Sequence, residues 1–430
     1  MKVKTLLHTL LLLALTTAAM PAAAQFDNTL NAFSPYTFYG IGDLNFSGTA
    51  ATKTMGGIGA ATRSGTSFNI VNPASYSAAA PQAFLFSFGM QGRNDYLKSG
   101  AFKSSHNAFN INDISLQFRI LDGLGFGLSV TPYSTVGYKA SFVDNSSPLS
   151  DMGVTRYSYT GNGGINQFKA GLGWRPAKGL SIGVNMLYYL GSINRISEST
   201  FSGIISSSDD FRITRITDKR QVNTMNVELG AQYDIRLRGG RAVTFGAVYE
   251  PQRRAGIRRS YSVINEGAYT TDTLMASATK TQFVLPHRVV AGFAYRTGKL
   301  VVGADYDFQK WSGSMNDEPI SSGGSFSTTD SRNIRAGFEY TPNRYDIRDM
   351  LKRWTYRGGI RYGNTYYRMN GRQIKEYAVT VGFGAPLQRN SFTAVNFGAE
   401  VGQTGRASGS LTRDTFFKVY LGFNIFATQD

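Results

Sequence analysis

The chain has 430 residues, a formal net charge of +17 and no cysteine. The lack of cysteine excludes a disulfide scaffold, a cysteine nucleophile and a lipid anchor on a cysteine side chain. A 13% aromatic content together with 48 glycines is typical of repeated β-structure with many tight turns.

The first 24 residues have the pattern of a secretory signal peptide. Lys2 and Lys4 precede an apolar run over 6–19, and small residues lead to a cleavage site after about Ala24. Removing the two lysines lowers the net charge from +17 to +15. Beyond this segment no apolar run approaches the ~20 residues of a spanning helix. If the mature chain crosses a membrane, it does so as a β-barrel.

Residues 25–81 are predicted to form an N-terminal plug. Between 34 and 76 the sequence is rich in glycine and shows neither a helical nor a strand period, because glycine disfavours both structures. Irregular backbone at membrane depth must be enclosed by protein or by a water-filled cavity. We therefore expect this segment to lie in the lumen of a barrel formed by residues 82–426, with a short tail at 427–430.

The rest of the chain repeats one unit of about ten residues, in which apolar residues alternate with polar or small ones. The predicted fold class is all-β, an antiparallel transmembrane β-barrel of about 14 strands. The strands are expected near 82–92, 109–121, 124–134, 165–175, 179–190, 222–238, 241–250, 287–297, 299–309, 331–341, 354–363, 375–385, 391–402 and 414–426.

The connections between these strands alternate in length. Short glycine-containing turns alternate with long segments, as periplasmic turns and extracellular loops do in outer-membrane barrels. One connection on the short side, 342–353, is unusually long and charged. The last strand has an apolar stripe that includes Phe417, Val419 and Ile425, which is expected to face lipid and is similar to the C-terminal insertion signal of such barrels.

A family resemblance rests on four glycine- or proline-containing motifs. The plug motif residues are Gly40, Gly42, Gly56, Gly57, Asn72, Pro73 and Ala74, and the third strand contains Thr131, Pro132 and Tyr133. With about 14 strands behind them, these motifs resemble the FadL/OmpP1/TodX family of outer-membrane transporters for hydrophobic compounds, in a divergent Bacteroidota-type branch. The resemblance implies an outer-membrane location in a Gram-negative bacterium. It also implies an inward kink of the third strand that opens a lateral exit, and Pro132 is consistent with such a break.

Polar residues, including charges of both signs, are expected to face the lumen. They include Asp113, Gln117, Arg119, Glu228, Gln232, Asp234, Arg236, Asp305, Asp307, Arg335, Glu339, Arg357, Arg361 and Glu400. One interpretation is that these residues pair across strands and anchor the plug by charge-assisted hydrogen bonds. The other is that they line a path for an ion or a substrate.

A hydrophobic ligand would need an apolar pocket, and the plug offers candidates for it. The predicted substrate-binding residues are Phe38, Tyr39, Phe46, Met55, Ile58 and Phe68. The same residues could instead pack the plug against the wall. Outside the barrel, apolar residues of the loops 191–221 and 251–286 could form a docking groove, as the resemblance implies, or could pack the loops together. These residues are Ile193, Phe201, Ile204, Ile205, Tyr261, Ile264, Tyr269 and Leu274.

A basic cluster lies just above the predicted membrane. Arg253, Arg254, Arg258 and Arg259 are expected to contact the phosphates of outer-leaflet lipid and lipopolysaccharide. Nucleic acid is not an expected partner of a chain that is expected in the outer membrane.

The sequence gives no support for an enzyme. After the signal peptide only two histidines remain, without a nucleophile motif. No catalytic residue, metal site or cofactor is predicted.

Two functions remain open. The first is passive uptake of a fatty-acid-like hydrophobic small molecule through the plug and a lateral opening near the third strand. The alternative is a non-transporting barrel of the same fold that acts as a subunit of outer-membrane assembly or secretion machinery, with envelope proteins as partners. The long turn 342–353 and the charged lumen motivate the alternative.

Overall fold

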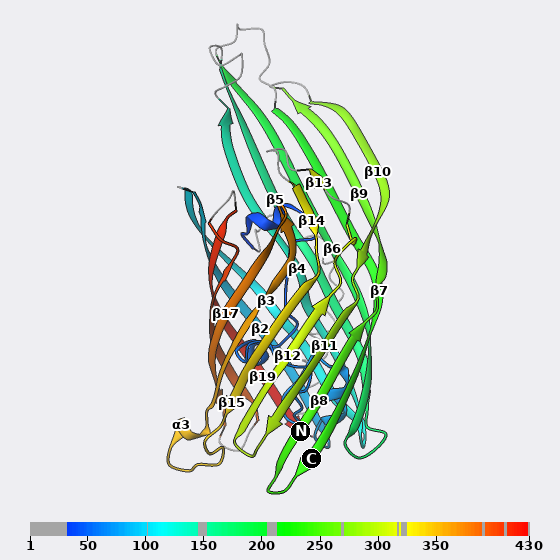
Figure 1. The fold of residues 1–430 in the computed structure, drawn as a ribbon, viewed down its shortest axis with the longest axis vertical. Helices are drawn as coiled ribbons and strands as arrows, with labels where there is room; N and C mark the ends of the chain where they lie inside the picture. Colours follow the sequence, from blue (N-terminus) through cyan, green and yellow to red (C-terminus); the bar gives the residue numbers. More distant parts are fainter. Residues whose placement is uncertain are drawn as a thin grey trace, which may run out of the picture.

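The protein is a closed β-barrel around a plug (Figure 1). The structure, a computed structural model, describes residues 32–100, 102–144, 153–203, 213–267, 271–315, 318–319, 325–388, 392–407 and 411–428. The predicted signal peptide lies outside the described residues, as do Ile204, Ile205 and Tyr269 of the predicted loop groove. Among the described residues, no helix is long and apolar enough to cross a membrane.

The plug occupies the residues before the first barrel strand. It has little regular structure: η1 (Pro35–Phe38), β1 (Asp43–Leu44), α2 (Ala50–Lys53) and η2 (Pro73–Ala78). Four glycines of the predicted motifs, Gly40, Gly42, Gly56 and Gly57, have positive φ angles between 66° and 94°, a region that other residues rarely adopt. Because such angles fit neither helix nor strand, the irregular backbone expected from the sequence follows directly.

Fourteen strands form the wall of the barrel. They are β2 (Ala83–Ser99), β3 (Phe102–Leu121), β4 (Leu124–Asp144), β5 (Gly153–Trp174), β6 (Leu180–Gly203), β7 (Ile213–Leu237), β8 (Arg241–Glu250), β11 (Arg288–Arg296), β12 (Leu300–Gln309), β15 (Ser331–Tyr340), β16 (Thr355–Met369), β17 (Arg372–Pro386), β18 (Ala394–Thr404) and β19 (Arg413–Thr428). Each of these fourteen strands pairs antiparallel with the next of the fourteen, so that β8 pairs with β11 and β12 pairs with β15, and β19 closes the circle on β2. The predicted all-β fold and strand number are confirmed.

Two differences from the expected strands concern their ends. The segment 251–286, predicted as a loop, contains the hairpin β9 (Arg253–Glu266) and β10 (Thr271–Leu285), and β9 pairs with the upper part of β7. The wall over β5, β6, β7, β9 and β10 therefore rises above the rest of the barrel (Figure 1). At the other end, β19 runs to Thr428, so that 427–428 of the predicted tail belong to the strand. Two short strands, β13 (Glu318–Pro319) and β14 (Ser325–Thr328), extend the sheet on β16.

The two faces of the wall differ as the alternating pattern predicts. On β19 Phe417 and Val419 are exposed, whereas the flanking residues Phe416 and Tyr420 are buried. The exposed face is apolar, as a lipid-facing surface must be. The buried side chains point inward, and the largest cluster of them, which includes Tyr36, Tyr189 and Trp311, joins the plug to the wall.

Candidate functional site

The first contact between plug and wall is made by residues 32–45, which we call the N-terminal latch. The latch runs along β4. The Ser34 N–H donates to the Gly137 carbonyl at 2.8 Å, and the Asn45 N–H donates to the Tyr133 carbonyl at 2.9 Å. Between these points, Asp43 and Leu44 of β1 pair with Thr135 and Ser134 of β4.

The latch lies where the wall is interrupted. The pairing of β3 with β4 extends from Leu121 and Leu124 up to Ile114 and Val130, and no pair beyond Val130 is found among the described residues. Pro132 follows two residues later, and the register of β4 on β5 shifts between Pro132 and Ser134, because proline has no N–H to donate. In place of β3, β1 pairs with β4 above this point.

The latch also contacts the other edge of this gap. Phe33 stacks on His106 of β3, and a small cavity beside the latch is bounded by Asn110, Pro132 and Thr135. The chain's own N-terminal segment therefore bridges the gap between β3 and β4.

Deeper in the lumen, the plug backbone touches the wall at glycines. The Gly56 N–H donates to Thr380 Oγ1 at 3.0 Å, and Thr380 in turn donates to the Thr54 carbonyl at 2.9 Å. A Cβ on Gly337 or Gly359 of the wall would overlap the backbone of Met55 and Gly56. Backbone can approach backbone this closely only where the wall residue has no side chain.

Asn72 joins two parts of the plug to two strands. Its side-chain Oδ1 accepts from the Ala74 N–H and caps η2, while Nδ2 donates to the Ala60 carbonyl at 2.7 Å. The same Nδ2 lies 3.1 Å from the carbonyl of Ala231 and 3.3 Å from that of Ala247. The role of the Asn72-Pro73-Ala74 motif in this structure is thus to hold η2 against β7 and β8.

Three groups of charges on the inner face of the wall lie against the plug. Asp307 accepts from Arg288 and Arg335, and Arg335 also donates to the Gly57 carbonyl. A second group pairs Arg361 with Glu376 and Glu400, and Glu400 with Lys418. In the third, Lys169 donates to Glu228 at 2.9 Å. In this environment, removing one partner of a buried pair costs about 3–5 kcal/mol.

Phe46 of the plug is held between two guanidinium groups. The ring lies 4.4 Å from the guanidinium carbon of Arg335 and 4.8 Å from that of Arg361. Such cation–π contacts contribute about 2 kcal/mol when they are desolvated. Phe46, which is predicted to bind an apolar ligand, contacts the guanidinium groups of Arg335 and Arg361 instead.

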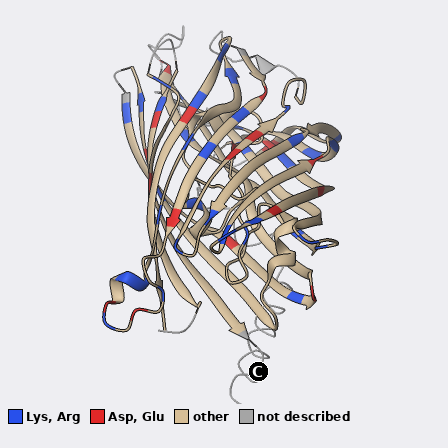
Figure 2. Cartoon of the chain, turned by 60° about the horizontal axis from the view of Figure 1, so that its bottom comes forward, with Lys and Arg blue, Asp and Glu red and all other residues tan. Residues whose placement is uncertain are grey.

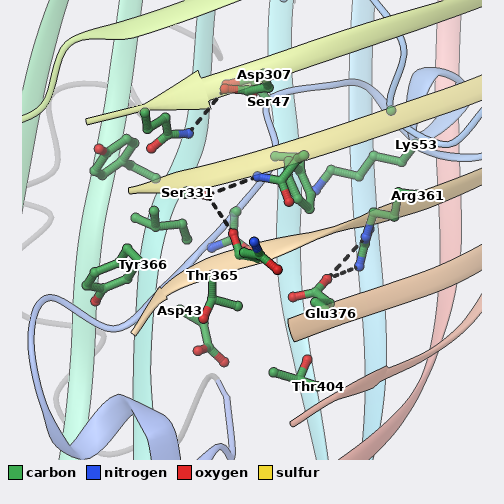
Figure 3. Close-up of a pocket in the computed structure, with 18 of the residues that line it drawn as sticks. Asp43, Ser47, Lys53, Asp307, Ser331, Arg361, Thr365, Tyr366, Glu376 and Thr404 are labelled. Carbon is green, nitrogen blue, oxygen red and sulfur yellow. Dashed lines mark hydrogen bonds and ion pairs between the residues drawn. The ribbon is translucent and has the colours of Figure 1, made fainter. Parts of the chain in front are cut away.

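A cavity remains beside Phe46, and its lining is polar (Figure 3). Figure 3 shows Asp43, Lys53, Arg361 and Glu376 around it, with Arg361 bound to Glu376. The cavity volume is about 80 Å³, which is less than the ~150 Å³ of a dry cavity that holds one benzene. The space suits a few water molecules better than a monoaromatic or a fatty acid.

Two plug groups at this cavity have shifted pKa values because they are buried. Burial raises the pKa of Asp43 to about 6, although Arg93 opposes the shift. Burial lowers the pKa of Lys53 to about 7, and the nearby Lys418 adds to that effect. Both shifts favour the neutral form of the side chain.

Comparison with known proteins places this arrangement in a family. The sequence matches the family described as BamG over residues 4–427. The chain belongs to the BamG family. No curated protein matches the sequence significantly.

Solved structures with the same fold are outer-membrane channels of low sequence identity. A FadL homologue of Pseudomonas aeruginosa has a TM-score of 0.59 at 13% identity, over 90% of this chain and 99% of that chain. The monoaromatic hydrocarbon channel CymD has a TM-score of 0.55 at 15% identity, over 90% and 100% of the two chains. The toluene transporter TbuX of Ralstonia pickettii has a TM-score of 0.52 at 14% identity, over 88% and 98%. The predicted FadL-like fold is confirmed, and this BamG-family protein is an outer-membrane β-barrel.

In this BamG-family barrel the six predicted substrate-binding residues do not converge on one pocket. Phe38 and Tyr39 pack with each other and against the main buried cluster. Phe46 lines the cavity, while Phe68 packs against Tyr76 in a separate cluster. Met55 and Ile58 are buried at the contact between plug and wall. A role for these residues in ligand binding stays a prediction.

The predicted lipid-phosphate contacts lie on β9. Arg253, Arg254 and Arg258 are exposed. Arg259 differs, because its guanidinium pairs with Asp218 of β7 at 2.9 Å. Three of the four arginines are thus placed where they could reach lipid, and contact with lipopolysaccharide stays a prediction. Of the predicted loop groove, Ile193 is fully buried and Leu274 is exposed.

The buried lysine and the half-buried aspartate at the cavity were not predicted. Asp43 and Lys53 belong to the irregular plug, where no period shows which way a side chain points. By contrast, the alternating pattern identified Asp307, Arg361 and Glu400 of the wall. Among the described residues, no three histidine, aspartate or glutamate side chains are grouped so that they could hold a metal ion.

Proposed function

We propose that this protein is a non-transporting barrel of the FadL fold that acts as a subunit of the machinery that assembles outer-membrane proteins. The observation that carries the proposal is the filled lumen, in which buried ion pairs surround a cavity of only about 80 Å³. The family description BamG supports the choice of machinery, because the name points to the Bam assembly complex.

The energetics of the lumen favour a structural role for the plug. To open a path past Phe46, the plug would have to leave Arg335 and Arg361, and the fixed hydrogen bonds of Gly56, Gly57 and Asn72 would break. Each buried polar group left without a partner costs about 1–3 kcal/mol. A passive solute of low affinity cannot supply the sum, so the barrel is closed at rest.

The test is purification of the tagged protein from its own outer membrane in mild detergent, with quantification of the proteins that accompany it. We expect barrel-assembly components in a fixed ratio to the tagged chain, and none in a preparation from cells with an untagged copy. A barrel that is recovered alone after mild cross-linking in cells would refute the proposed function.

Passive uptake of a hydrophobic small molecule is the second candidate, and the missing pairing of β3 and β4 above Val130 favours it. Native mass spectrometry of the same preparation addresses it. A retained fatty acid or other apolar molecule, lost in the variants Phe46→Asp and Met55→Asp, would support uptake. An empty barrel that travels with partner proteins would exclude it.

A further inference from the structure

The connection between β15 and β16 is the long one on the rim of short turns. We call residues 342–353 the periplasmic knob, because short turns of outer-membrane barrels face the periplasm. The knob ends in the short helix α3 (Met350–Arg353). It projects away from the barrel wall, as Figure 1 and Figure 2 both show.

The knob has a fixed internal structure. The Asn343 N–H donates to the Lys352 carbonyl at 2.8 Å and closes the turn. Asp346 Oδ1 accepts from the backbone N–H groups of Asp349 and Arg348 at 2.8 and 2.9 Å. These two bonds hold the pKa of Asp346 below its ordinary value, and the bond from Asp349 has the larger effect. The knob is therefore a formed surface.

The base of the knob is also attached to the barrel. The guanidinium of Arg344 lies 3.8 Å from the ring of Phe392 in the neighbouring periplasmic turn. The Tyr356 hydroxyl donates to the Leu351 carbonyl at 3.0 Å. A partner that bound the knob would thus be held in a fixed orientation to the barrel wall.

This fixed surface exposes large apolar side chains. The exposed fractions are 67% for Tyr345, 72% for Ile347 and 55% for both Met350 and Leu351. These four large apolar side chains are exposed within seven residues of chain outside the membrane band, and such a concentration of exposed apolar residues is a candidate interaction site. A pre-formed surface of this kind binds at a lower entropic cost than a flexible loop.

The occupant is better explained as protein than as lipid. The membrane interface is marked by aromatic residues at the strand ends, Tyr340 and the stacked pair of Trp354 and Phe383. The knob lies beyond Tyr340 in the chain, and three of its four exposed apolar residues are aliphatic.

We propose that the periplasmic knob docks into an apolar groove with an acidic margin on a periplasmic domain of the assembly machinery. The acidic margin follows from the charge of the knob, which has four basic and two acidic residues. Both carboxylates accept backbone N–H groups within the knob. Lys352 lies 3.7 Å from Asp349 with 55% of its side chain exposed, and Arg348 is exposed, so both cations can face the partner. The inference rests on the proposed function, since it names the surface through which that machinery is bound.

The test compares two variants in the purification from native membranes. The double variant Ile347→Asp with Met350→Asp is expected to lose at least one accompanying periplasmic protein more than tenfold. Leu121→Asp is the matched control, because Leu121 is 65% exposed at another periplasmic turn, and it should retain all partners. Heat-modifiable migration on gels verifies that both barrels are folded.

Charge reversal and cross-linking provide a second readout. Arg348→Glu with Lys352→Glu should lose the same protein, and benzoylphenylalanine in place of Ile347 should cross-link to it in cells. Cross-links to lipid only, or full retention of partners by the knob variants, would overturn the inference while the proposed function stands. If the wild-type protein has no partners, the proposed function fails first.

Discussion

At the scale of single residues, Lys53 makes the plug sensitive to pH. Its ammonium is buried beside Lys418, and its pKa is lowered to about 7. A lysine in a released plug has an ordinary pKa near 10.4. Between these two values the released plug binds more protons than the docked plug. Docking therefore strengthens as the pH rises from about 7 to about 10, and it is weakest below pH 7.

Lys53→Met should remove this dependence. The methionine keeps an unbranched chain over the Tyr420 ring and has no charge to desolvate. We expect proteinase K to cut the plug about tenfold more slowly at pH 7 than in the wild type, equivalent to about 1.4 kcal/mol, with little change up to pH 9.5. Cleavage of the denatured protein corrects for the pH dependence of the protease. An unchanged slope with pH in the variant would assign the effect to another group.

At the scale of elements, the sequence identifies strands only where the membrane requires an apolar face. The predicted strand 165–175 covers only the last part of β5, which extends from Gly153 to Trp174, and the hairpin of β9 and β10 was missed. Above the membrane both faces of a strand meet water or protein, so the alternation of apolar residues disappears. The same reason explains why Asp307 and Arg361 of the wall were predicted to face the lumen, whereas the partners that the plug offers them were not.

The contact between plug and wall depends on elements that approach backbone to backbone. Gly359→Ala should loosen the plug, because the new Cβ would overlap Met55 and Gly56. Overpacking of this kind costs about 1–3 kcal/mol, so we expect proteolysis of the plug to rise about ten- to a hundredfold while the barrel stays folded. Gly92→Ala is the control, since a Cβ there meets nothing within 4 Å. Equal resistance of both variants would mean that the plug can shift at no cost.

At the scale of the whole molecule, two closures act in series. The lumen is filled by the plug, and the gap between β3 and β4 is bridged by the N-terminal latch. A solute that entered from outside would have to displace the plug before it reached the N-terminal latch. The barrel shares its fold with hydrocarbon channels. Its function, however, depends on what fills the lumen.

Opening the second closure alone should reveal which of the two controls passage. A side chain on Gly137 would overlap the backbone of Ala32, so Gly137→Val should detach the latch from β4. Gly256→Val is the matched control, because a Cβ on Gly256 meets nothing within 4 Å.

In planar bilayers we expect wild type and control to pass no resolvable ion current, because the lumenal ion pairs stay intact. We expect the Gly137→Val barrel to admit a hydrophobic dye from the membrane into the gap between β3 and β4. We expect it still to pass no resolvable ion current. A steady current through the wild-type barrel would contradict this account, since it would require a continuous aqueous path past Arg335, Phe46 and Arg361, and passive transport would then become the better description of the protein.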